Sequence, residues 1–394
     1  MDNKKNGIPK LRFPGFTGAW EQRKLGEITS HRGGTAIEKY FDENGEYKVI
    51  SIGSYGLNSK YVDQNIRAKS NEITNERVVH AGELTMVLND KTANGTIIGR
   101  SLLIENDNEY VINQRTEIIT PKENFNNKFA YTLLNGPFRN KVRRIVQGGT
   151  QIYVNYSSVE KLTVFLPNIK EQEEIGKFFN QLDSLIALHQ RKLEHLQEQK
   201  KGLLQKMFPK NGETVPEVRF PGFTDAWEQR RLGEVTEIKT GSRNHQDSVD
   251  NGKYPFFVRS EKVERLNEYD FDTKAILVPG DGRIGEIFHY YDGKFALHQR
   301  VYKVDNFKEV NPLYLLNLFK YKFKKHALRL NAQGTVPSLR LPMFTNWNIL
   351  IPNLNEQQKI GLFFQQLDSL ITLHQRKLDH LELMKKGLLQ QMFV

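Results

Sequence analysis

Polar and basic side chains able to hydrogen-bond with nucleotide bases or to bind phosphate gather in loops of two stretches of the sequence, residues 30–166 and 237–351. Amides and hydroxyls exchange hydrogen bonds with base edges, and Arg and Lys bind base edges or phosphate oxygens. In the first stretch the candidates are Asn89, Lys91, Thr92, Arg115, Arg143, Arg144, Gln147, Thr150, Gln151 and Tyr153. In the second stretch they are Arg259, Arg283, Arg300, Lys324, Lys325, Gln333, Thr335 and Arg340. Each of them taken singly is also explained as an ordinary solvated loop residue, so the prediction of a nucleic-acid-binding surface depends on their clustering.

The charge balance favours a polyanionic partner. The sequence has 57 Lys and Arg against 46 Asp and Glu, which gives a formal net charge of +11 and a pI near 9.4. Such an excess of cations favours binding to nucleic acid, because neutralising phosphates releases condensed counterions. The alternative explanation is a general bias toward solubility, since acidic residues are interspersed with the basic ones.

Cysteine is absent from the sequence, which excludes disulfide bonds and thiolate metal sites and is typical of a reducing cytoplasm. No stretch approaches the roughly 18 apolar residues that a membrane helix needs. The N-terminal segment MDNKKNGIPKLRF has lysines but no apolar run behind them, so it does not resemble a signal peptide. We therefore expect a cytoplasmic protein that makes no contact with a membrane.

The motifs of nucleic-acid enzymes are missing from the sequence. A phosphate loop requires Ser or Thr after its Gly-Lys pair, whereas the pairs that begin at residues 176, 252 and 293 are followed by Phe, Tyr and Phe. The string Asn311-Pro312-Leu313-Tyr314 is similar to the N-P-P-Y with which amino-methyltransferases hold an adenine. Its third residue is Leu, however, and Asn-Pro at the start of an apolar helix is typical of an N-cap. With no Ser-His-Asp spacing and no H-E-x-x-H zinc motif, we predict no catalytic residues and no metal or cofactor bound by this chain.

The segments that would position the candidate side chains occur twice in the chain. Residues 9–29 and 216–236 are identical at 16 of 21 positions, at an offset of 207, and residues 167–208 and 352–393 are identical at 30 of 42 positions, at an offset of 185. Between these repeats the two halves are dissimilar, apart from short matches such as Gln114-Arg115 with Gln299-Arg300. The pattern indicates an internal duplication with a pseudo-two-fold axis, in which two constant frames carry two variable domains.

The longer repeat predicts two long helices, because its apolar residues recur at spacings of three and four and form a heptad seam. The seam contains Ile175, Phe179, Leu182, Ile186, His189, Leu193, Leu196 and Leu203 in the first copy, and Ile360, Phe364, Leu367, Ile371, His374, Leu378, Leu381 and Leu388 in the second. A helix from Glu171 to Met207 would be about 55 Å long and would need a partner along its seam. We expect the two copies to pair as an antiparallel coiled coil. The polar seam residues, the histidines together with Lys200 and Lys385, could respond to pH or bind a metal, but fixing the register of the pair is the simpler role.

Short β-like runs broken by Gly, Asn and Asp alternate with helical pieces in both variable stretches, which predicts two compact α+β domains. We divide the chain into a first globular domain at residues 1–166, a first long helix at 167–209, a second globular domain at 210–351 and a second long helix at 352–394.

This organisation resembles the specificity (S) subunit of type I restriction-modification systems. The resemblance lies in FPGFTGAWEQRKLGEI, in PNIKEQEEIGKFFNQLDSLIALHQRKLEHLQEQKKGLLQKMF and in their second copies, and it covers essentially the whole chain. The G-x-x-G pattern followed by Gln114-Arg115, and by Gln299-Arg300 in the second half, is similar to the target recognition domains of that family.

The resemblance implies that each globular domain is a target recognition domain reading one half of a bipartite, asymmetric site in double-stranded DNA. The helices would then set the gap between the half-sites and dock methyltransferase subunits. Two methyltransferase (M) subunits would bring S-adenosylmethionine and methylate adenine at N6, and two restriction (R) motor subunits would use ATP and Mg²⁺ to cut foreign DNA in phage defence. The chain itself would be the non-catalytic specificity subunit.

Two other functions remain open at this point. A coiled-coil scaffold that tethers proteins without reading DNA would explain the helices, but not the divergent, basic domains. A self-sufficient modification enzyme would need the cofactor and catalytic motifs that the sequence lacks. Salt-dependent binding to DNA separates the specificity subunit from the scaffold, and binding of S-adenosylmethionine separates it from the enzyme.

Overall fold

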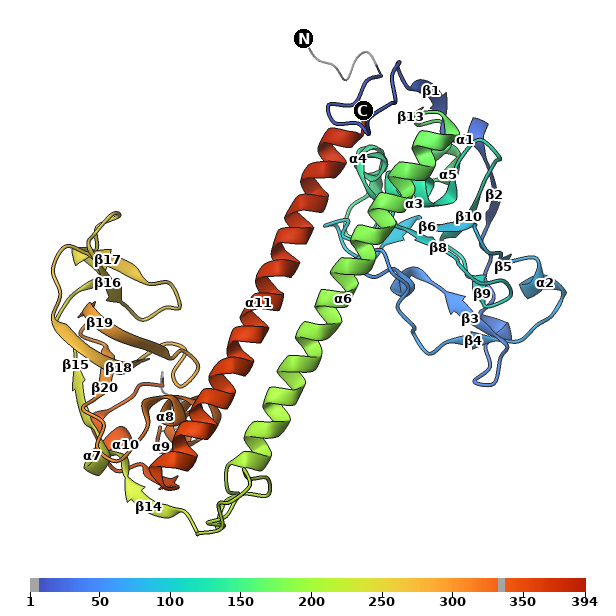
Figure 1. The fold of residues 1–394 in the computed structure, drawn as a ribbon. Coiled ribbons are helices and arrows are strands. Elements are labelled where there is room, and N and C mark those ends of the chain that lie inside the picture. Colours follow the sequence, from blue (N-terminus) through green and yellow to red (C-terminus); the bar gives the residue numbers. More distant parts are fainter. Residues whose placement is uncertain (1–6, 332–336) are drawn as a thin grey trace. The chain divides into compact units, whose positions relative to one another are not determined.

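The computed structural model describes residues 7–331 and 337–394, which form two compact units (Figure 1). Unit 1 comprises the chain up to His189 together with Lys377–Val394, and unit 2 comprises Gln190–Arg376. The long helices α6 (Ile169–Met207) and α11 (Leu354–Met392) each contribute one end to each unit. A unit is therefore one globular domain, the first part of one long helix and the last part of the other.

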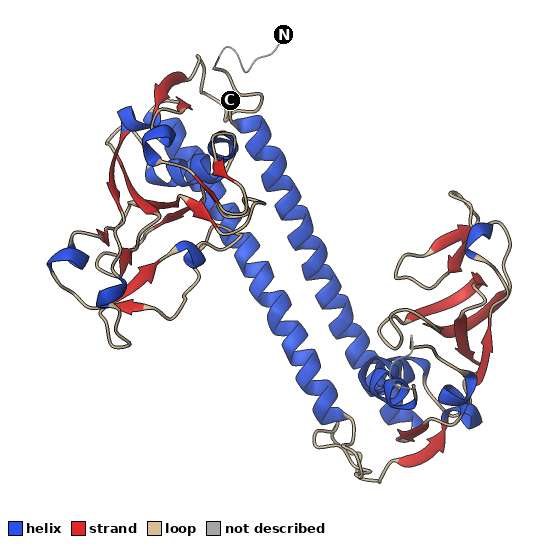
Figure 2. Ribbon diagram, turned by 180° about the vertical axis from the view of Figure 1, so that it is seen from behind, coloured by secondary structure: helices blue, strands red, loops and turns tan. Residues whose placement is uncertain are grey.

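The globular part of unit 1 contains several small sheets, seen as red strands in Figure 2. One sheet has the antiparallel order β2 (Thr29–Gly33), β10 (Thr116–Pro121), β6 (Leu84–Val87) and β8 (Ser101–Leu103). A second has the order β4 (Arg67–Ala68), β3 (Tyr47–Ile50), β9 (Tyr110–Ile112) and β5 (Val78–Val79), with β3 parallel to β9. Two smaller sheets consist of β11 (Gln147–Gly148), β12 (Ile152–Tyr153) and β7 (Asn89–Asp90), and of β1 (Glu21–Lys24) with β13 (Thr163–Leu166). The helices are α1 (Leu25–Ile28), α2 (Glu72–Asn75), α3 (Asn127–Asn135), α4 (Pro137–Arg143) and α5 (Tyr156–Val159), with 3-10 turns at Glu38–Tyr40 and Ile52–Ser54.

The globular part of unit 2 has one larger sheet. Its strand order is β15 (Glu237–Thr240), β20 (Val301–Asp305), β18 (Phe271–Pro279), β19 (His289–Leu297), β16 (Tyr254–Phe257) and β17 (Glu264–Leu266). A separate pair joins β14 (Glu228–Arg231) to β21 (Asn348–Ile351). The helices are α7 (Leu232–Val235), α8 (Pro312–Leu318), a π-helical turn at Phe319–Phe323, α9 (Lys324–Leu330) and α10 (Leu341–Thr345), with a 3-10 turn at His245–Asp247. Both globular parts mix helices with mostly antiparallel strands, so the predicted α+β class is confirmed.

The long helices run antiparallel within each unit. In unit 1, Phe179 of α6 packs on Phe393 with ring centroids 6.0 Å apart, and Asp183 pairs with Lys385 at 2.5 Å. In unit 2, Phe364 of α11 packs on Phe208 at 6.3 Å, and Asp368 pairs with Lys200. Residue numbers rise along one helix as they fall along the other, which confirms the antiparallel coiled coil.

The heptad seam is the face that each helix turns away from solvent. Its buried residues are Ile175, Phe179, Leu182, Leu193, Ile360, Phe364, Leu367, Leu378 and Leu381, and its half-buried residues are Ile186, His189, Leu196, Leu203, Ile371, His374 and Leu388. Burial lowers the pKa of the Lys200 ammonium, while its hydrogen bond to Asp368 acts in the opposite direction. A shift of register would leave such a lysine desolvated without its carboxylate, so the paired charges favour one alignment of the helices.

The repeated RFPGF segment fastens each globular part to the start of a long helix. Arg12 makes hydrogen bonds of 2.6 and 2.7 Å to the two carboxylate oxygens of Glu171, and Arg219 makes bonds of 2.6 and 2.8 Å to those of Glu356. Both carboxylates are 0% exposed. The arginine forks therefore neutralise charges that the first turns of α6 and α11 bury.

Glycine allows each long helix to approach its globular part closely. A Cβ on Gly176 would lie 2.7 Å from the Phe129 backbone nitrogen, and one on Gly361 would lie 2.9 Å from the Leu313 Cβ. Such contacts are too short for any larger residue. The I-G dipeptide of the long repeat thus marks where α6 crosses α3 and where α11 crosses α8.

Aromatic residues at the far ends of the helices complete both cores in the same way. Phe393 stacks on Phe129 at 5.5 Å and meets the edge of Trp20 at 6.0 Å in unit 1. Phe208 stacks on Tyr314 at 5.5 Å and meets Trp227 at 6.0 Å in unit 2. The internal duplication read from the sequence is thus a duplication of core packing.

Candidate nucleic-acid interface

In unit 1 the small sheet of β11, β12 and β7 brings three predicted residues into one row. Tyr153 is the register partner of both Gln147 and Asn89. Side chains directly opposite each other in a sheet point to the same face. Gln147 is exposed, Tyr153 is 38% exposed and Asn89 is half-buried, whereas the next residue on β12, Ile152, faces the core. We call Gln147, Tyr153 and Asn89 the unit 1 row, and it presents two amides and a phenol to solvent.

The loop that follows Asn89 is organised by a buried carboxylate. Asp90 accepts hydrogen bonds from the Ile97 N–H at 2.8 Å and from the N–H and hydroxyl of Thr92 at 2.9 Å. Burial opposes ionisation of Asp90, but these hydrogen bonds outweigh it and lower the pKa of the carboxyl. Asp90 therefore acts inside the loop, and Lys91 and Thr92 are held at its exposed tip.

A cluster of arginines lies behind this loop. Arg139 donates to the carbonyl oxygens of Ile98, Gly95 and Thr96 at 2.7 to 3.0 Å, and Arg143 donates to Asn94 at 3.4 Å. Burial first, and then the neighbouring charges of Arg100 and Arg143, lower the pKa of Arg139 to about 10. We call Arg100, Arg139 and Arg143 the arginine cluster. Like charges held this close favour an anion such as phosphate beside them.

The remaining predicted residues of unit 1 surround the row. Arg115 has a positive φ of 69°, and its carbonyl accepts the Leu88 N–H at 2.9 Å, which places it beside the start of β7. Thr150 and Gln151 lie in the exposed turn between β11 and β12, and Arg144 is exposed at the end of α4. The structure thus gathers Asn89, Gln147, Tyr153 and their neighbouring loops at one edge of the unit.

In unit 2 two predicted arginines line a surface hollow. Its lining consists of Asn244, His245, Gln246, Arg259, His298, Gln299 and Arg300. Gln299 donates to the side-chain oxygen of Asn244 at 2.5 Å and so fixes the 3-10 turn against the β19–β20 turn. Burial, followed by the charge of nearby Arg259, lowers the pKa of His298. We call this group the unit 2 hollow, and it is cationic and rich in amides.

The other predicted residues of unit 2 that the structure describes are Arg283, Lys324, Lys325 and Arg340, and none of them lines this hollow. Arg283 pairs with Glu286 at 2.8 Å and with Glu261 at 3.0 Å, and Lys324 pairs with Glu286 at 2.5 Å. Lys325 is exposed on α9, and Arg340 is exposed at the N-cap of α10. Gln333 and Thr335 lie outside the described residues.

Several residues of both sites escaped the sequence analysis. Asn244, His245, Gln246 and His298 join the unit 2 hollow, and Arg100 joins the arginine cluster. The matching Gln-Arg pairs at 114–115 and 299–300 lie in the turns that border the two sites. The residues that complete each site come from distant segments. Sequence offers no comparable signal for those residues.

The Asn311-Pro312 string is a helix start, as expected. The Asn311 side chain accepts the N–H groups of Leu313 at 2.9 Å and Tyr314 at 3.1 Å. Tyr314 is fully buried and donates its hydroxyl to the Leu350 carbonyl at 2.6 Å. The Asn311 side-chain oxygen and the Tyr314 hydroxyl are therefore both engaged within the fold.

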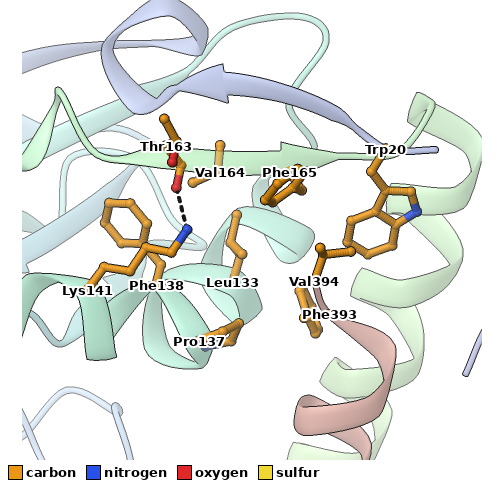
Figure 3. A pocket seen from close by; sticks show the side chains of 10 residues that line it. All are labelled: Trp20, Leu133, Pro137, Phe138, Lys141, Thr163, Val164, Phe165, Phe393 and Val394. Atoms are coloured by element: carbon orange, nitrogen blue, oxygen red, sulfur yellow. Dashed lines mark hydrogen bonds between the residues drawn. The ribbon is translucent and has the colours of Figure 1, made fainter. Parts of the chain in front are cut away.

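A small gap and the arrangement of possible metal ligands bear on other kinds of chemistry. Figure 3 shows the side chains that line a small gap in unit 1, among them Trp20, Phe138 and Phe393. The volume of the gap is about 10 Å³. That is room for about one water molecule. Within residues 7–331 and 337–394 there is no group of three acidic, His or Cys side chains placed to hold a metal ion. Nor does any helix of those residues combine the length and apolar character needed to cross a membrane.

The profile of the family described as the type I restriction modification DNA specificity domain matches residues 18–198 and, a second time, residues 224–383. The chain belongs to this family. Its two specificity domains coincide with the two halves of the duplication, so the family resemblance read from the sequence is confirmed.

Relatives of this specificity protein include whole subunits. It is 23% identical over 410 residues to the type I restriction enzyme MjaVIII specificity subunit of Methanocaldococcus jannaschii, a match that covers 94% of this chain and 91% of the relative. It is 31% identical over 146 residues to the EcoDI specificity subunit of Escherichia coli, which covers 37% of this chain and 31% of the relative.

A solved structure shows the same fold. The crystal structure of a type I restriction-modification system S subunit from M. genitalium superposes on the specificity protein with a TM-score of 0.73 at 15% identity. The superposition covers 98% of this chain and 99% of that one.

Proposed function

We propose that this specificity protein reads a bipartite, asymmetric site in double-stranded DNA, with one half-site for each unit. The observation that carries the proposal is that both units build the same backbone frame and place unlike side chains on it. Unit 1 presents the amides and phenol of its row, and unit 2 presents the arginines, histidines and amides of its hollow. Two similar backbone frames that carry different side chains favour recognition of two different half-sites within one DNA target.

The side chains divide naturally into base readers and phosphate contacts. Asn and Gln pair with adenine and Arg pairs with guanine through two hydrogen bonds in the major groove. The unit 1 row and the unit 2 hollow are the proposed base readers. The arginine cluster and the exposed cations Arg144, Lys325 and Arg340 are the proposed phosphate contacts, which would position the domains without reading sequence.

The proposal keeps the domain boundaries that were predicted from the sequence. Residues 1–166 and 210–351 are the proposed target recognition domains, and residues 167–209 and 352–394 are the proposed spacers that set the gap between half-sites. Exposed leucines at equivalent places on the two helices, Leu185 and Leu188 on α6 and Leu370 and Leu373 on α11, support two equivalent docking surfaces. Their proposed occupants are two methyltransferase subunits.

The chemistry belongs to the partners in this proposal. The methyltransferase subunits would bring S-adenosylmethionine and methylate adenine, and two restriction subunits would supply ATP-dependent cleavage with Mg²⁺. The chain itself would contribute specificity and no catalytic group. Its place of action would be the cytoplasm, where it would meet both resident and incoming DNA.

Mapping of adenine methylation across a genome tests the proposal. Cells that express this chain with its methyltransferase subunit are compared with cells that lack only this chain. We expect a new split, asymmetric motif methylated on both strands, and exchange of residues 237–351 for those of a relative should change one half of it. Unchanged methylation in cells where the complex assembles would refute the proposal and favour a scaffold.

A further inference from the structure

The two units repeat one set of backbone contacts around their candidate readers. In unit 1 the Leu88 N–H donates to the Arg115 carbonyl at 2.9 Å, and the Val154 N–H donates to the Leu88 carbonyl at 2.9 Å. In unit 2 Gly280 donates to Arg300 at 2.7 Å, and Leu339 donates to Gly280 at 2.6 Å. Leu88 and Gly280 therefore occupy the same place in the two frames.

The next residue along the chain shows the same equivalence. Asn89 pairs with Tyr153 across β7 and β12, and Asp281 forms the corresponding bridge with Ser338. Asn89 and Asp281 are thus the same position in two different readers. One unit has an amide there, and the other has a carboxylate.

A second equivalence locates Arg259. The Asn113 N–H donates to the Ile50 carbonyl at 2.9 Å in unit 1, and the His298 N–H donates to the Phe257 carbonyl at 3.0 Å in unit 2. Two residues after these carbonyls lie Ile52 and Arg259, respectively. Ile52 packs on an apolar cluster, whereas Arg259 is 52% exposed and lines the unit 2 hollow.

The two unit-specific residues contact each other in unit 2. Arg259 Nη1 lies 3.3 Å from Asp281 Oδ2, and the Asp281 side chain is 25% exposed. Because Asp281 is anchored through its bridge to Ser338, its carboxylate restrains the guanidinium at one side, while the Arg259 side chain as a whole stays 52% exposed. A guanidinium held in this way is prepared to make two parallel hydrogen bonds with a planar acceptor pair.

We propose that Arg259, positioned by Asp281, reads a guanine in the half-site of unit 2 and that this pair is a specificity determinant for which unit 1 has no counterpart. The inference rests on the proposed function. Guanine is the base that offers two acceptors, O6 and N7, along its major-groove edge. A phosphate is the less suitable ligand, because the carboxylate of Asp281 would repel it, whereas the like-charged arginine cluster of unit 1 would attract it.

The test compares methylation motifs of the full complex carrying Arg259→Gln, Asp281→Asn or Lys262→Gln. Lys262 is the matched control, since it is a 79% exposed cation three residues from Arg259. We expect Arg259→Gln to reduce discrimination for guanine at one motif position by roughly 5- to 150-fold. Asp281→Asn should relax the same position to a smaller extent, and the double variant should be no worse than Arg259→Gln. Lys262→Gln should leave the motif unchanged.

Two outcomes overturn the inference while leaving the proposed function intact. One is a motif that keeps its guanine requirement in Arg259→Gln, and the other is relaxation of Arg259→Gln and Asp281→Asn at different positions. Failure of the proposed function looks different, because the unmodified chain would then direct no bipartite motif at all. Equal melting temperatures of the variants ensure that a relaxed motif is not caused by partial unfolding.

Discussion

The buried ion pair of Arg219 and Glu356 allows a quantitative test of how the RFPGF segment holds unit 2 together. Arg219→Met removes two charge-assisted hydrogen bonds, of 2.6 and 2.8 Å, to a carboxylate that is 0% exposed. The substitution keeps an unbranched apolar stem, so most of the packing along the segment remains. The loss of stability is therefore caused chiefly by the Glu356 carboxylate, which is left buried without its partner.

Removal of one partner from a buried ion pair costs about 3–5 kcal/mol, and this range sets the size of the loss. The first turn of a helix stabilises a carboxylate by roughly 0.5 kcal/mol, and Glu356 lies in the first turn of α11. We expect unit 2 to lose about 3 kcal/mol at pH 7.

Hydrogen exchange of the full-length chain, followed by mass spectrometry, measures the loss unit by unit. Peptides from unit 1 serve as an internal control, and Arg12→Met should move the same loss to unit 1. Arg219→Met combined with Glu356→Gln should recover most of the stability. A loss below about 1 kcal/mol at pH 7 would refute the reasoning.

Three further predictions address the readers and the core. Tyr153→Ala should lower the preference for the specific duplex over a scrambled one by roughly 5- to 100-fold at fixed salt, which competition binding measures, whereas an unchanged ratio would remove Tyr153 from the readers. Phe208→Ala should destabilise unit 2 by about 3–5 kcal/mol, since it removes a buried ring stacked on Tyr314, and exchange confined to unit 2 peptides is the expected readout. Because the pKa of His298 is lowered in the folded chain, unit 2 should lose stability as the pH falls through about 6.5. His298→Asn, which introduces the residue that unit 1 has at this place, should remove that loss in melts between pH 7 and 5.

The frame of the molecule could be predicted from the sequence because it is local and repeated. Heptad spacing defines α6 and α11 without knowledge of any distant contact. The start of α6 differs slightly from the prediction, at Ile169 instead of Glu171, and the Asn168 side chain accepts the Glu171 N–H at 3.0 Å there. The position of this cap depends on where the preceding strand ends, and the sequence pattern does not define that point.

The reading sites could be predicted as loops but not as assembled surfaces. Asn89 and Tyr153 are far apart in the sequence, and the register that unites them depends on two-residue strands too short to leave a pattern. One of the two carboxylates that pair with Arg283 belongs to Glu261, in the loop between β16 and β17. Charge at a loop position is visible in the sequence, whereas its neutralisation by a distant neighbour depends on the tertiary fold.

The helix ends that close each core also set the order in which the protein can mature on the ribosome. Unit 2 consists of one continuous segment, Gln190–Arg376, and can finish packing as soon as that segment has emerged. Unit 1 begins first, but its core needs Leu381, Met392 and Phe393, which are synthesised after the whole of unit 2. The first globular part must therefore wait through the synthesis of the whole second part with an apolar surface uncovered, and during this interval a nascent chain is most exposed to aggregation.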